Sequence, residues 1–372
     1  MQTTRVAALT DSTGLNDELA VLAAVEPSDA PFLSCYIDMR QGREACMAYL
    51  QRKISAIGAP LHGVSRIDLD VAAEMVLREV ESRWTAHAAG MAVFARSLAG
   101  GRHLSVLQFA SAFDNRVVWY RAPEILPLLA LAQHAPPTRV LLARGDSLEL
   151  MDFELGLARS HAWAQAPLLA NGPARNGAGV SAPQLISDDR SLHAMRRHVA
   201  SGEAPLLLAG DVPVMRALAD WLPVRAASRL IGSIALSARL QGDTAVTAVR
   251  EQIHAMHADQ ALQMVNRLLL RMRRHGSAAA GQIAAFEALR AGSADVLLVV
   301  DRCGGESASG PTASWDPLIE LPRLAFERGA RVVVSDADAL RYLGGVACLL
   351  HGPEEHDAMP LPPVAQHLDL VA

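Results

Sequence analysis

Two continuous runs of apolar residues near the carboxy end of the chain constrain its fold most. Residues 294–301 read ADVLLVVD and residues 329–335 read GARVVVS. Neither run alternates apolar with polar residues, and such strands are typical of sheets that helices cover on both faces. The spacing predicts a helix between the two runs, then a short helix over residues 336–343 and a last strand over residues 345–350. We therefore predict an α/β unit with a largely parallel sheet.

The composition is that of a globular protein. The chain has 372 residues, enough for two or three domains, and 51% of them are hydrophobic. No stretch reaches the ~20 apolar residues of a membrane span, and the first residues lack the basic start and apolar core of a signal peptide. The four cysteines form no Cys-x-x-Cys pair. We expect a cytoplasmic protein with no disulfide framework, no metal, no cofactor and no membrane contact.

The charge balance argues against a protein that grips nucleic acid over its whole surface. The formal net charge is -5, whereas such proteins usually carry a strong basic excess. We therefore expect no DNA partner. Lys53 is the only lysine, and we interpret the preference for arginine as a bias of genomic composition.

Residues 1–136 are predicted to form an N-terminal α/β domain that ends at the sequence Ala135-Pro-Pro137. Its predicted helices are residues 15–25, 43–57, 67–87 and 123–133. Its predicted strands are residues 32–39, 90–96, 103–109 and 116–120.

Residues 138–240 are predicted to form a middle domain. Three short strands separated by glycine turns, at residues 139–143, 148–153 and 157–163, indicate a meander. Helix and strand alternate after a Gly/Pro/Asn-rich loop over residues 167–186. This order resembles the ribonuclease H-like arrangement.

Residues 241–352 begin with the longest predicted helix, over residues 243–275. Its apolar residues recur every three or four positions and form one stripe, so the helix is suited to bridging two domains. A second helix over residues 281–290 leads into the C-terminal α/β unit. Residues 353–372 are predicted to be an irregular tail.

The order of these elements resembles the middle and C-terminal domains of archaeal and eukaryotic class I peptide chain release factors and their ribosome-rescue relatives. The segments EALRAG (residues 287–292) and GARV (residues 329–332) match core patterns of that family. The segments PFLSCYIDMRQG (residues 31–42), GMAVFA (residues 90–95) and APEILPLLALA (residues 122–132) are similar to its bacterial branch. The resemblance implies three α/β domains: a family-specific N-terminal one, a ribonuclease H-like middle one and a small three-layer C-terminal one.

The family hydrolyses peptidyl-tRNA with a Gly-Gly-Gln tripeptide on the loop after the third strand of the middle domain. Two glycines allow a backbone shape closed to other residues, and the glutamine helps to position the attacking water. The corresponding loop here contains no such tripeptide. The residues at the degenerate catalytic-loop position are Asn171, Gly172, Gly177, Gly179 and Gln184. We therefore predict no catalytic residue and expect no release activity.

Other motifs predict little chemistry. A nuclease would need facing carboxylates for two metal ions, but the first middle-domain strand has no acid, and Asp152 and Glu154 are interpreted as solvated edge residues. The run from His351 to His356 is one residue too long for a zinc-binding His-x-x-Glu-His motif and contains Gly-Pro. We predict no metal site at either place.

Two groups of arginines are the only features directed at RNA. Their members are Arg190, Arg196 and Arg197 on a middle-domain helix, and Arg267, Arg271, Arg273 and Arg274 at the end of the long helix. A helix dipole favours cations at that end, and contact with RNA phosphates is the functional alternative.

Three functions remain in view. The first is a non-catalytic release-factor-like protein that binds the ribosome, tRNA or a translation factor. The second is a protein-interaction module unrelated to translation, and the third is a hydrolase of unknown substrate. The sequence predicts neither the individual partner nor the oligomeric state.

Overall fold

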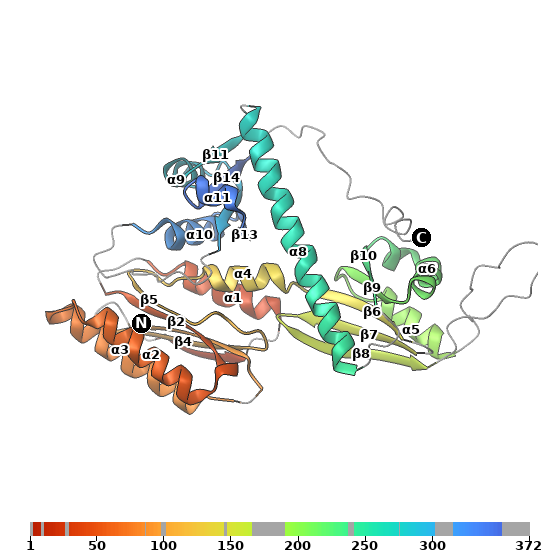
Figure 1. The fold of residues 1–372 in the computed structure, drawn as a ribbon, viewed down its shortest axis with the longest axis horizontal. Coiled ribbons are helices and arrows are strands. Elements are labelled where there is room, and N and C mark those ends of the chain that lie inside the picture. The colour runs from red at the N-terminus through yellow and green to blue at the C-terminus, as the bar shows by residue number, and fades with distance from the viewer. Residues whose placement is uncertain are drawn as a thin grey trace, which may run out of the picture. The chain divides into compact units, whose positions relative to one another are not determined.

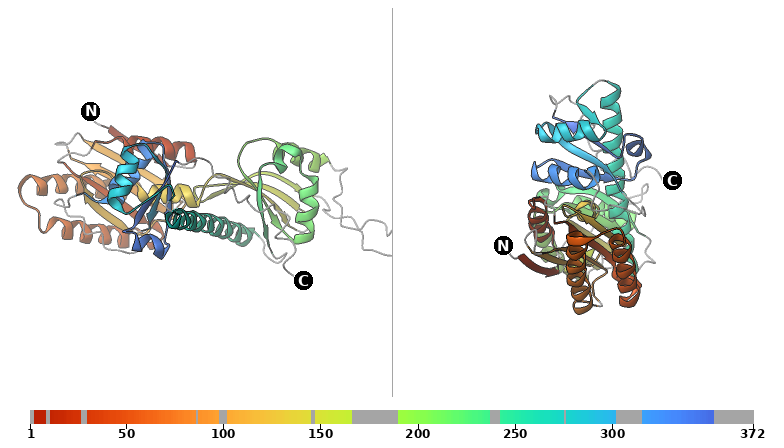
Figure 2. Two further views of the ribbon diagram at one scale, coloured as in Figure 1. Left: turned by 90° about the horizontal axis from the view of Figure 1, so that it is seen from above. Right: turned by 90° about the vertical axis from the view of Figure 1, so that its left-hand side faces the viewer.

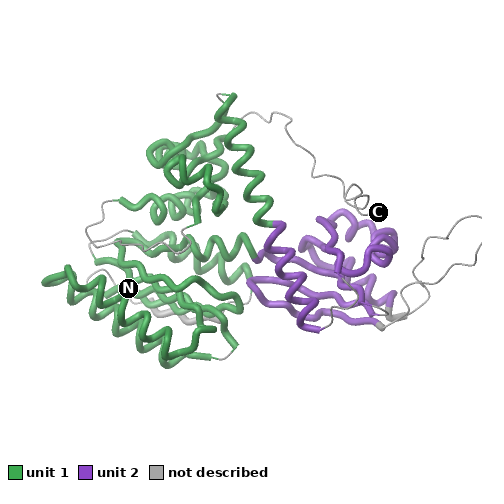
Figure 3. Tube along the Cα trace, viewed as in Figure 1, with its two compact units in different colours: residues 1–134, 257–353 green, residues 135–256, 354–372 purple. Residues whose placement is uncertain are grey.

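The computed structural model describes residues 3–8, 11–26, 30–85, 87–97, 102–144, 147–165, 190–236, 242–274, 276–301 and 315–351. These residues form a mixed α/β protein with three sheets (Figures 1 and 2). The chain divides into two compact units (Figure 3). The first unit joins residues 1–134 to residues 257–353, and residues 135–256 form the described part of the second.

The N-terminal sheet of the first unit has the order β1-β4-β3-β2-β5. Its strands are β1 (Thr3–Ala8), β2 (Phe32–Asp38), β3 (Gly90–Arg96), β4 (His103–Phe109) and β5 (Arg116–Tyr120). Only β1 and β4 pair in parallel; the other neighbours are antiparallel. All seven residues of β2 are buried, because helices cover this central strand on both faces.

Four helices and one short turn of 3₁₀ helix surround this sheet. They are α1 (Ser12–Ala23), η1 (Met39–Gln41), α2 (Arg43–Gly58), α3 (Gly63–Ser82) and α4 (Leu126–His134). Helices α2 and α3 cover one face, where Leu50 and Val76 pack against Leu33 and Val93. Helices α1 and α4 lie on the other face (Figure 1). The α1 helix begins where the Asp11 side chain accepts a hydrogen bond from Gly14 N at 2.7 Å.

The C-terminal sheet of the first unit has the order β11-β14-β12-β13. Its strands are β11 (Ala278–Ala280), β12 (Ala294–Val300), β13 (Arg331–Ser335) and β14 (Val346–Leu350). Its helices are α9 (Gln282–Arg290), α10 (Pro317–Glu327) and α11 (Asp338–Tyr342), together with the second half of α8 (Gly242–Arg273). Helices cover both faces, which explains the unalternated apolar strands.

The prediction of a largely parallel C-terminal sheet was wrong. Only β12 and β13 pair in parallel, whereas β14 runs antiparallel to β12 and β11 runs antiparallel to β14. The reason is the connection after β13. The five-residue helix α11 is about 7.5 Å long at 1.5 Å per residue and does not return the chain across the sheet. The next strand therefore starts at the end where β13 finishes.

The sheet of the second unit has the order β10-β9-β6-β7-β8. Its strands are β6 (Thr138–Arg144), β7 (Ser147–Glu154), β8 (Leu157–Gln165), β9 (Leu206–Gly210) and β10 (Leu230–Ala235). The first three form an antiparallel meander, and β9 and β10 add in parallel. Helices α5 (Arg190–Ala200), α6 (Val212–Trp221) and α7 (Val224–Ala227) complete the unit. This is the ribonuclease H-like arrangement that the sequence predicts.

The predicted apolar stripe of the long helix is confirmed. Val249 and Ile253 of α8 are buried in the core of the second unit, and Val265 and Leu268 are buried in the core of the first. The boundary between the units falls at Met256 in the same helix. The three-domain division at residues 1–136, 138–240 and 241–352 remains a proposal, because the first and third of these segments share one compact unit.

Candidate functional site

The end of α8 carries three exposed arginines. Arg267 and Arg273 lie in the helix, and Arg274 follows it; all three side chains are exposed. With 100° of rotation per residue they lie on the same side of the helix as Leu270, which is 49% exposed. We call Arg267, Arg273 and Arg274 the α8 arginine patch.

Arg271, the fourth arginine predicted here, has a structural role. Its side chain is half-buried, and its Nη1 donates to the carbonyl oxygen of Leu350 at 3.1 Å. Leu350 is the last residue of β14, so this bond ties the helix to the sheet beneath it. Sequence spacing does not separate Arg271 from its neighbours, because all of them occupy the same helical turns.

The α8 arginine patch is locally positive on a chain that is negative overall. No acidic residue occurs in the sequence between Asp259 and Glu287. The negative end of the helix dipole stabilises cations at this position. This surface therefore fits an anionic partner.

The α5 group is smaller. Arg196 and Arg197 are exposed, and the Arg196 guanidinium lies 6.0 Å from the centroid of the Trp221 ring. Arg190 begins the helix, but its side chain is outside the described residues. This helix belongs to the second unit and the α8 arginine patch to the first, so their convergence on one surface stays a prediction.

Two arginines that sequence reasoning missed close the end of α5. Arg139 donates to Ser201 O at 2.6 Å and forms an ion pair with Asp152 at 2.7 Å. Arg229 donates to Val199 O at 2.7 Å and to Ala204 O at 2.8 Å. The last carbonyls of a helix lack partners within it, and both guanidinium groups supply donors. The only sequence signal was an arginine inside the apolar strand β6.

The degenerate catalytic loop lies outside the described residues, with Asn171, Gly172, Gly177, Gly179 and Gln184 in it. Nothing in the structure tests their role. The predicted absence of release activity therefore continues to rest on the sequence.

The carboxylates considered for a nuclease have other neighbours. Asp152 is paired with Arg139, and His161 lies 3.8 Å from it. Within the described ranges, no group of three His, Cys, Asp or Glu side chains is placed to hold a metal ion. His351 ends the last described segment, and His356 falls outside it.

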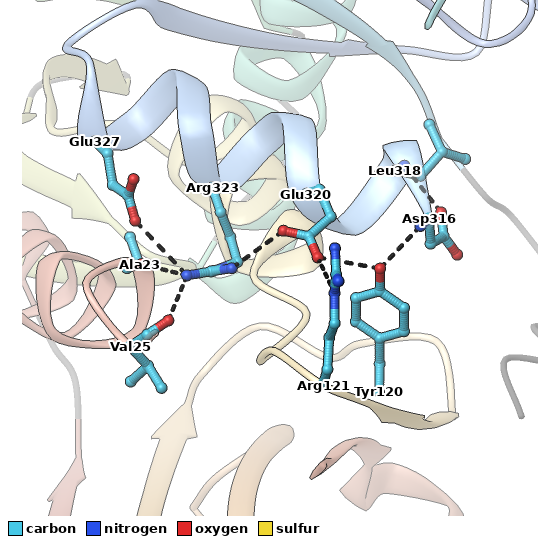
Figure 4. A network of polar contacts seen from close by, with 9 residues as sticks. All are labelled: Ala23, Val25, Tyr120, Arg121, Asp316, Leu318, Glu320, Arg323 and Glu327. Carbon is cyan, nitrogen blue, oxygen red and sulfur yellow. Dashed lines mark hydrogen bonds and ion pairs between the residues drawn. The ribbon is translucent and has the colours of Figure 1, made fainter. Parts of the chain in front are cut away.

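A polar network connects α10 to the N-terminal domain (Figure 4). Arg323, with 5% of its side chain exposed, donates to Ala23 O at 2.7 Å and also to Val25 O. Its guanidinium lies 3.4 Å from Glu320 and 3.6 Å from Glu327. Burial lowers the pKa of Arg323, and the nearby carboxylates oppose this shift.

Glu320 extends the network to the end of β5. It accepts a hydrogen bond from Arg121 Nε at 2.7 Å and one from the Tyr120 hydroxyl at 3.1 Å. The same hydroxyl accepts a bond from Asp316 N at 2.9 Å. Burial raises the pKa of Tyr120, so it is a neutral donor at physiological pH. We call the contacts of Arg323 and Glu320 the clamp, because they tie α10 to the end of α1 and to the end of β5.

A buried ion pair lies beneath the N-terminal sheet. Arg116 Nη1 lies 2.9 Å from Glu124, whose side chain is 1% exposed. Burial lowers the pKa of Arg116, but the Glu124 carboxylate more than offsets this, so the pKa is raised. The Tyr36 hydroxyl donates to Glu124 O at 2.6 Å, and burial raises its pKa. These contacts hold the segment before α4 on the sheet.

The sequence matches no protein-family model and no curated protein. Solved structures similar to it include the archaeal translation termination factor aRF1, at 15% identity over 92% of this chain and 99% of that one, with a TM-score of 0.29. Another is Dom34 of S. cerevisiae, at 12% identity over 72% and 81% of the two chains, with a TM-score of 0.41. A third is Pelota of Archaeoglobus fulgidus, at 16% identity over 71% of this chain and 80% of that one, with a TM-score of 0.32. At these values the likeness assigns neither activity nor partner to this chain.

No described helix is long and apolar enough to cross a membrane.

Proposed function

We infer that this chain is a non-catalytic, cytoplasmic binding protein of the translation apparatus, and that it binds RNA of the ribosome or a tRNA through the α8 arginine patch. The observation that carries this proposal is the exposure of Arg267, Arg273 and Arg274 on a segment without acids. Arginine side chains bind phosphate oxygens in the geometry of a planar fork. Arg196 and Arg197, which are also exposed, support a second contact from the other unit.

The carboxylates and tyrosines described above support the non-catalytic part of the proposal. Asp152, Glu124 and Glu320 each form an ion pair with an arginine, which supports a structural role for them. The missing Gly-Gly-Gln tripeptide gives the same indication from the sequence.

Ribosome sedimentation at low and moderate salt tests the proposal. Wild-type protein should co-sediment with ribosomes at low salt, and the triple variant R267A R273A R274A should stay in the supernatant. The triple variant R290A R328A R331A removes three other exposed arginines of the same unit and should co-sediment like the wild type. The proposal would be contradicted if R267A R273A R274A still co-sedimented with ribosomes. It would also be contradicted if both triple variants stayed in the supernatant.

A second candidate function is protein docking by the outer end of the C-terminal sheet. Ile283 is 74% exposed and Tyr342 is 90% exposed. Gln282 Nε2 donates to Gly344 O at 3.3 Å, which holds the two segments that bear them side by side. Exposed aromatic residues are frequent anchors of protein interfaces. If this surface is the principal one, I283A Y342A should abolish co-purification of a protein partner while R267A R273A R274A leaves it intact.

A further inference from the structure

Strand β13 lies at the edge of the C-terminal sheet. It pairs with β12 on one side, and no strand of the described residues pairs with its other side. Its sequence, RVVVS, is rich in β-branched valine. An edge strand of this kind presents unpaired N–H and C=O groups to any extended chain that reaches it.

Gln133 of α4 occupies the open side of β13. Its Oε1 accepts a hydrogen bond from Val334 N at 2.7 Å, and its Nε2 donates to Val334 O at 2.8 Å. A side-chain amide carries the same donor and acceptor as a peptide group. Gln133 therefore makes with Val334 the pair of bonds that a residue of a neighbouring antiparallel strand would make.

The position of Gln133 depends on contacts between the N-terminal domain and the C-terminal sheet. Leu126 of α4 is buried in the same core as Leu297 and Val334. The clamp fixes α10 of the C-terminal sheet to the N-terminal domain: Arg323 binds the end of α1, and Glu320 binds Arg121 (Figure 4). The contact has both polar and apolar parts, and contacts between domains of one chain permit relative motion unless they are large and hydrophobic.

The backbone of β13 is complementary to itself. The N–H and C=O of Val334 face away from β12, because they bind Gln133. The direction of the backbone groups alternates along a strand. The N–H and C=O of Val332 therefore also face away from β12, and those of Val333 face toward it. An antiparallel pair centred on Val333 then places Val332 opposite Val334 of a second strand, and both residues carry outward donors and acceptors. Arg331 falls opposite Ser335, so no like charges meet.

We propose that Gln133 is an autoinhibitory cap on β13, and that a second copy of this chain pairs with β13 when the clamp opens. The two sheets then join edge to edge through four backbone hydrogen bonds. In the closed form the N-terminal domain keeps the protein from pairing in this way. This proposal concerns a different surface from the α8 arginine patch and does not depend on RNA binding.

The test uses three variants of the full chain. R323A Q133L removes the clamp and the cap, and analytical ultracentrifugation should show a dimer that grows with concentration. R323A Q282L removes instead a glutamine that bonds a backbone carbonyl at a place remote from β13 in the sheet order, and it should remain monomeric. R323A Q133L V332P also removes an outward N–H of β13 and should return to the monomer.

A folded R323A Q133L variant that stays monomeric at every concentration would overturn the proposal, and so would a dimer that persists with V332P. If R323A does not fold, hydrogen exchange of the Q133L variant tests whether Gln133 caps β13. The Val334 amide should exchange roughly tenfold faster than in the wild type, which is the loss of about one hydrogen bond. An unchanged exchange rate would show that Gln133 caps nothing.

Discussion

Arg323 on α10 donates a hydrogen bond to the carbonyl oxygen of Ala23 at the end of α1, although 300 positions separate the two residues in the chain. The last carbonyls of a helix need a donor from outside it, and here the donor comes from the C-terminal domain. The bond therefore links two segments that flank a complete intervening unit. It joins residues 1–134 to residues 257–353, which together form one compact unit.

Arg323→Ala should destabilise the first unit by about 3 kcal/mol, because it leaves the carbonyl oxygens of Ala23 and Val25 without their buried donor and removes one of the two cations that pair with Glu320. Urea unfolding measures this in a W163F W221F background, whose remaining tryptophans, Trp84, Trp119 and Trp315, all lie in the first unit. Arg328→Ala, at an exposed position just after the same helix, should stay within about 0.5 kcal/mol of the parent. Equal effects of the two substitutions would show that the network does not stabilise the unit.

The arginines at the end of α8 should separate into structural and binding residues. Arg271→Ala should destabilise the first unit by about 1 kcal/mol, because Leu350 O loses its donor. Arg267→Ala should leave stability unchanged within about 0.5 kcal/mol, because that side chain is exposed. The same urea titration measures both, and a larger loss for Arg267 than for Arg271 would reverse these roles.

RNA binding through the α8 arginine patch should depend on salt in a characteristic way. Each phosphate contact to a single strand contributes about 0.7 to the slope of log K against log salt. R267A R273A R274A should therefore lower the magnitude of the slope by about 2. Filter binding of ribosomal RNA at several salt concentrations measures the slope. A uniform loss of affinity with an unchanged slope would argue against phosphate contacts at these arginines.

Much of the fold follows from sequence pattern alone, because most strands here are buried runs bounded by turn residues. The bounds of β3, β4 and β5 agree with the expectation to the residue. Strand β1, Thr3–Ala8, was not predicted, since a short parallel edge strand carries no strong pattern. Strand β11, Ala278–Ala280, was not predicted either, because it is only three residues long and alanine does not favour strands. The direction of β14 was also missed, because it depends on the length of a connection and not on its composition.

The site was less predictable than the fold. Periodicity identifies which face of a helix is buried, so it could place Arg267 in solvent. It could not show that Arg271 reaches Leu350 or that Arg323 reaches Ala23, since both contacts join residues far apart in the chain. An arginine amid apolar residues, as in IELPRLAFE of α10, was the available signal. A charged residue is rarely buried unless it is paired, so such positions predict a partner without naming it.

The three described thiols, Cys35, Cys46 and Cys348, should resist labelling in the native protein because they are buried. Burial raises the pKa of Cys35 and of Cys46, and it raises the pKa of Cys348 to about 12. The thiolate is the reactive form, so these three should not react with Ellman's reagent in the native protein at pH 8. Native Cys303→Ser should release less than about 0.1 equivalent of the chromophore, and the same variant in guanidinium should release about three. Rapid reaction of the native variant would show that these side chains are not buried.

Asp38 should make stability fall in acid. Its carboxylate binds Arg40 at 2.8 Å, and this hydrogen bond holds its pKa below the usual 3.8, although burial acts in the opposite direction. A carboxyl with a lowered folded-state pKa contributes stability above its unfolded pKa and loses it as the pH falls through the folded pKa. Asp38→Asn should therefore cost about 1 kcal/mol at pH 6, and the difference from wild type should shrink as the pH falls below 3.8 and through the lowered pKa of Asp38. Asp17→Asn, at an exposed position on α1, is the control for the removal of one carboxylate. Urea unfolding at a series of pH values measures both, and a difference for Asp38→Asn that persists at low pH would assign the effect to packing and not to charge.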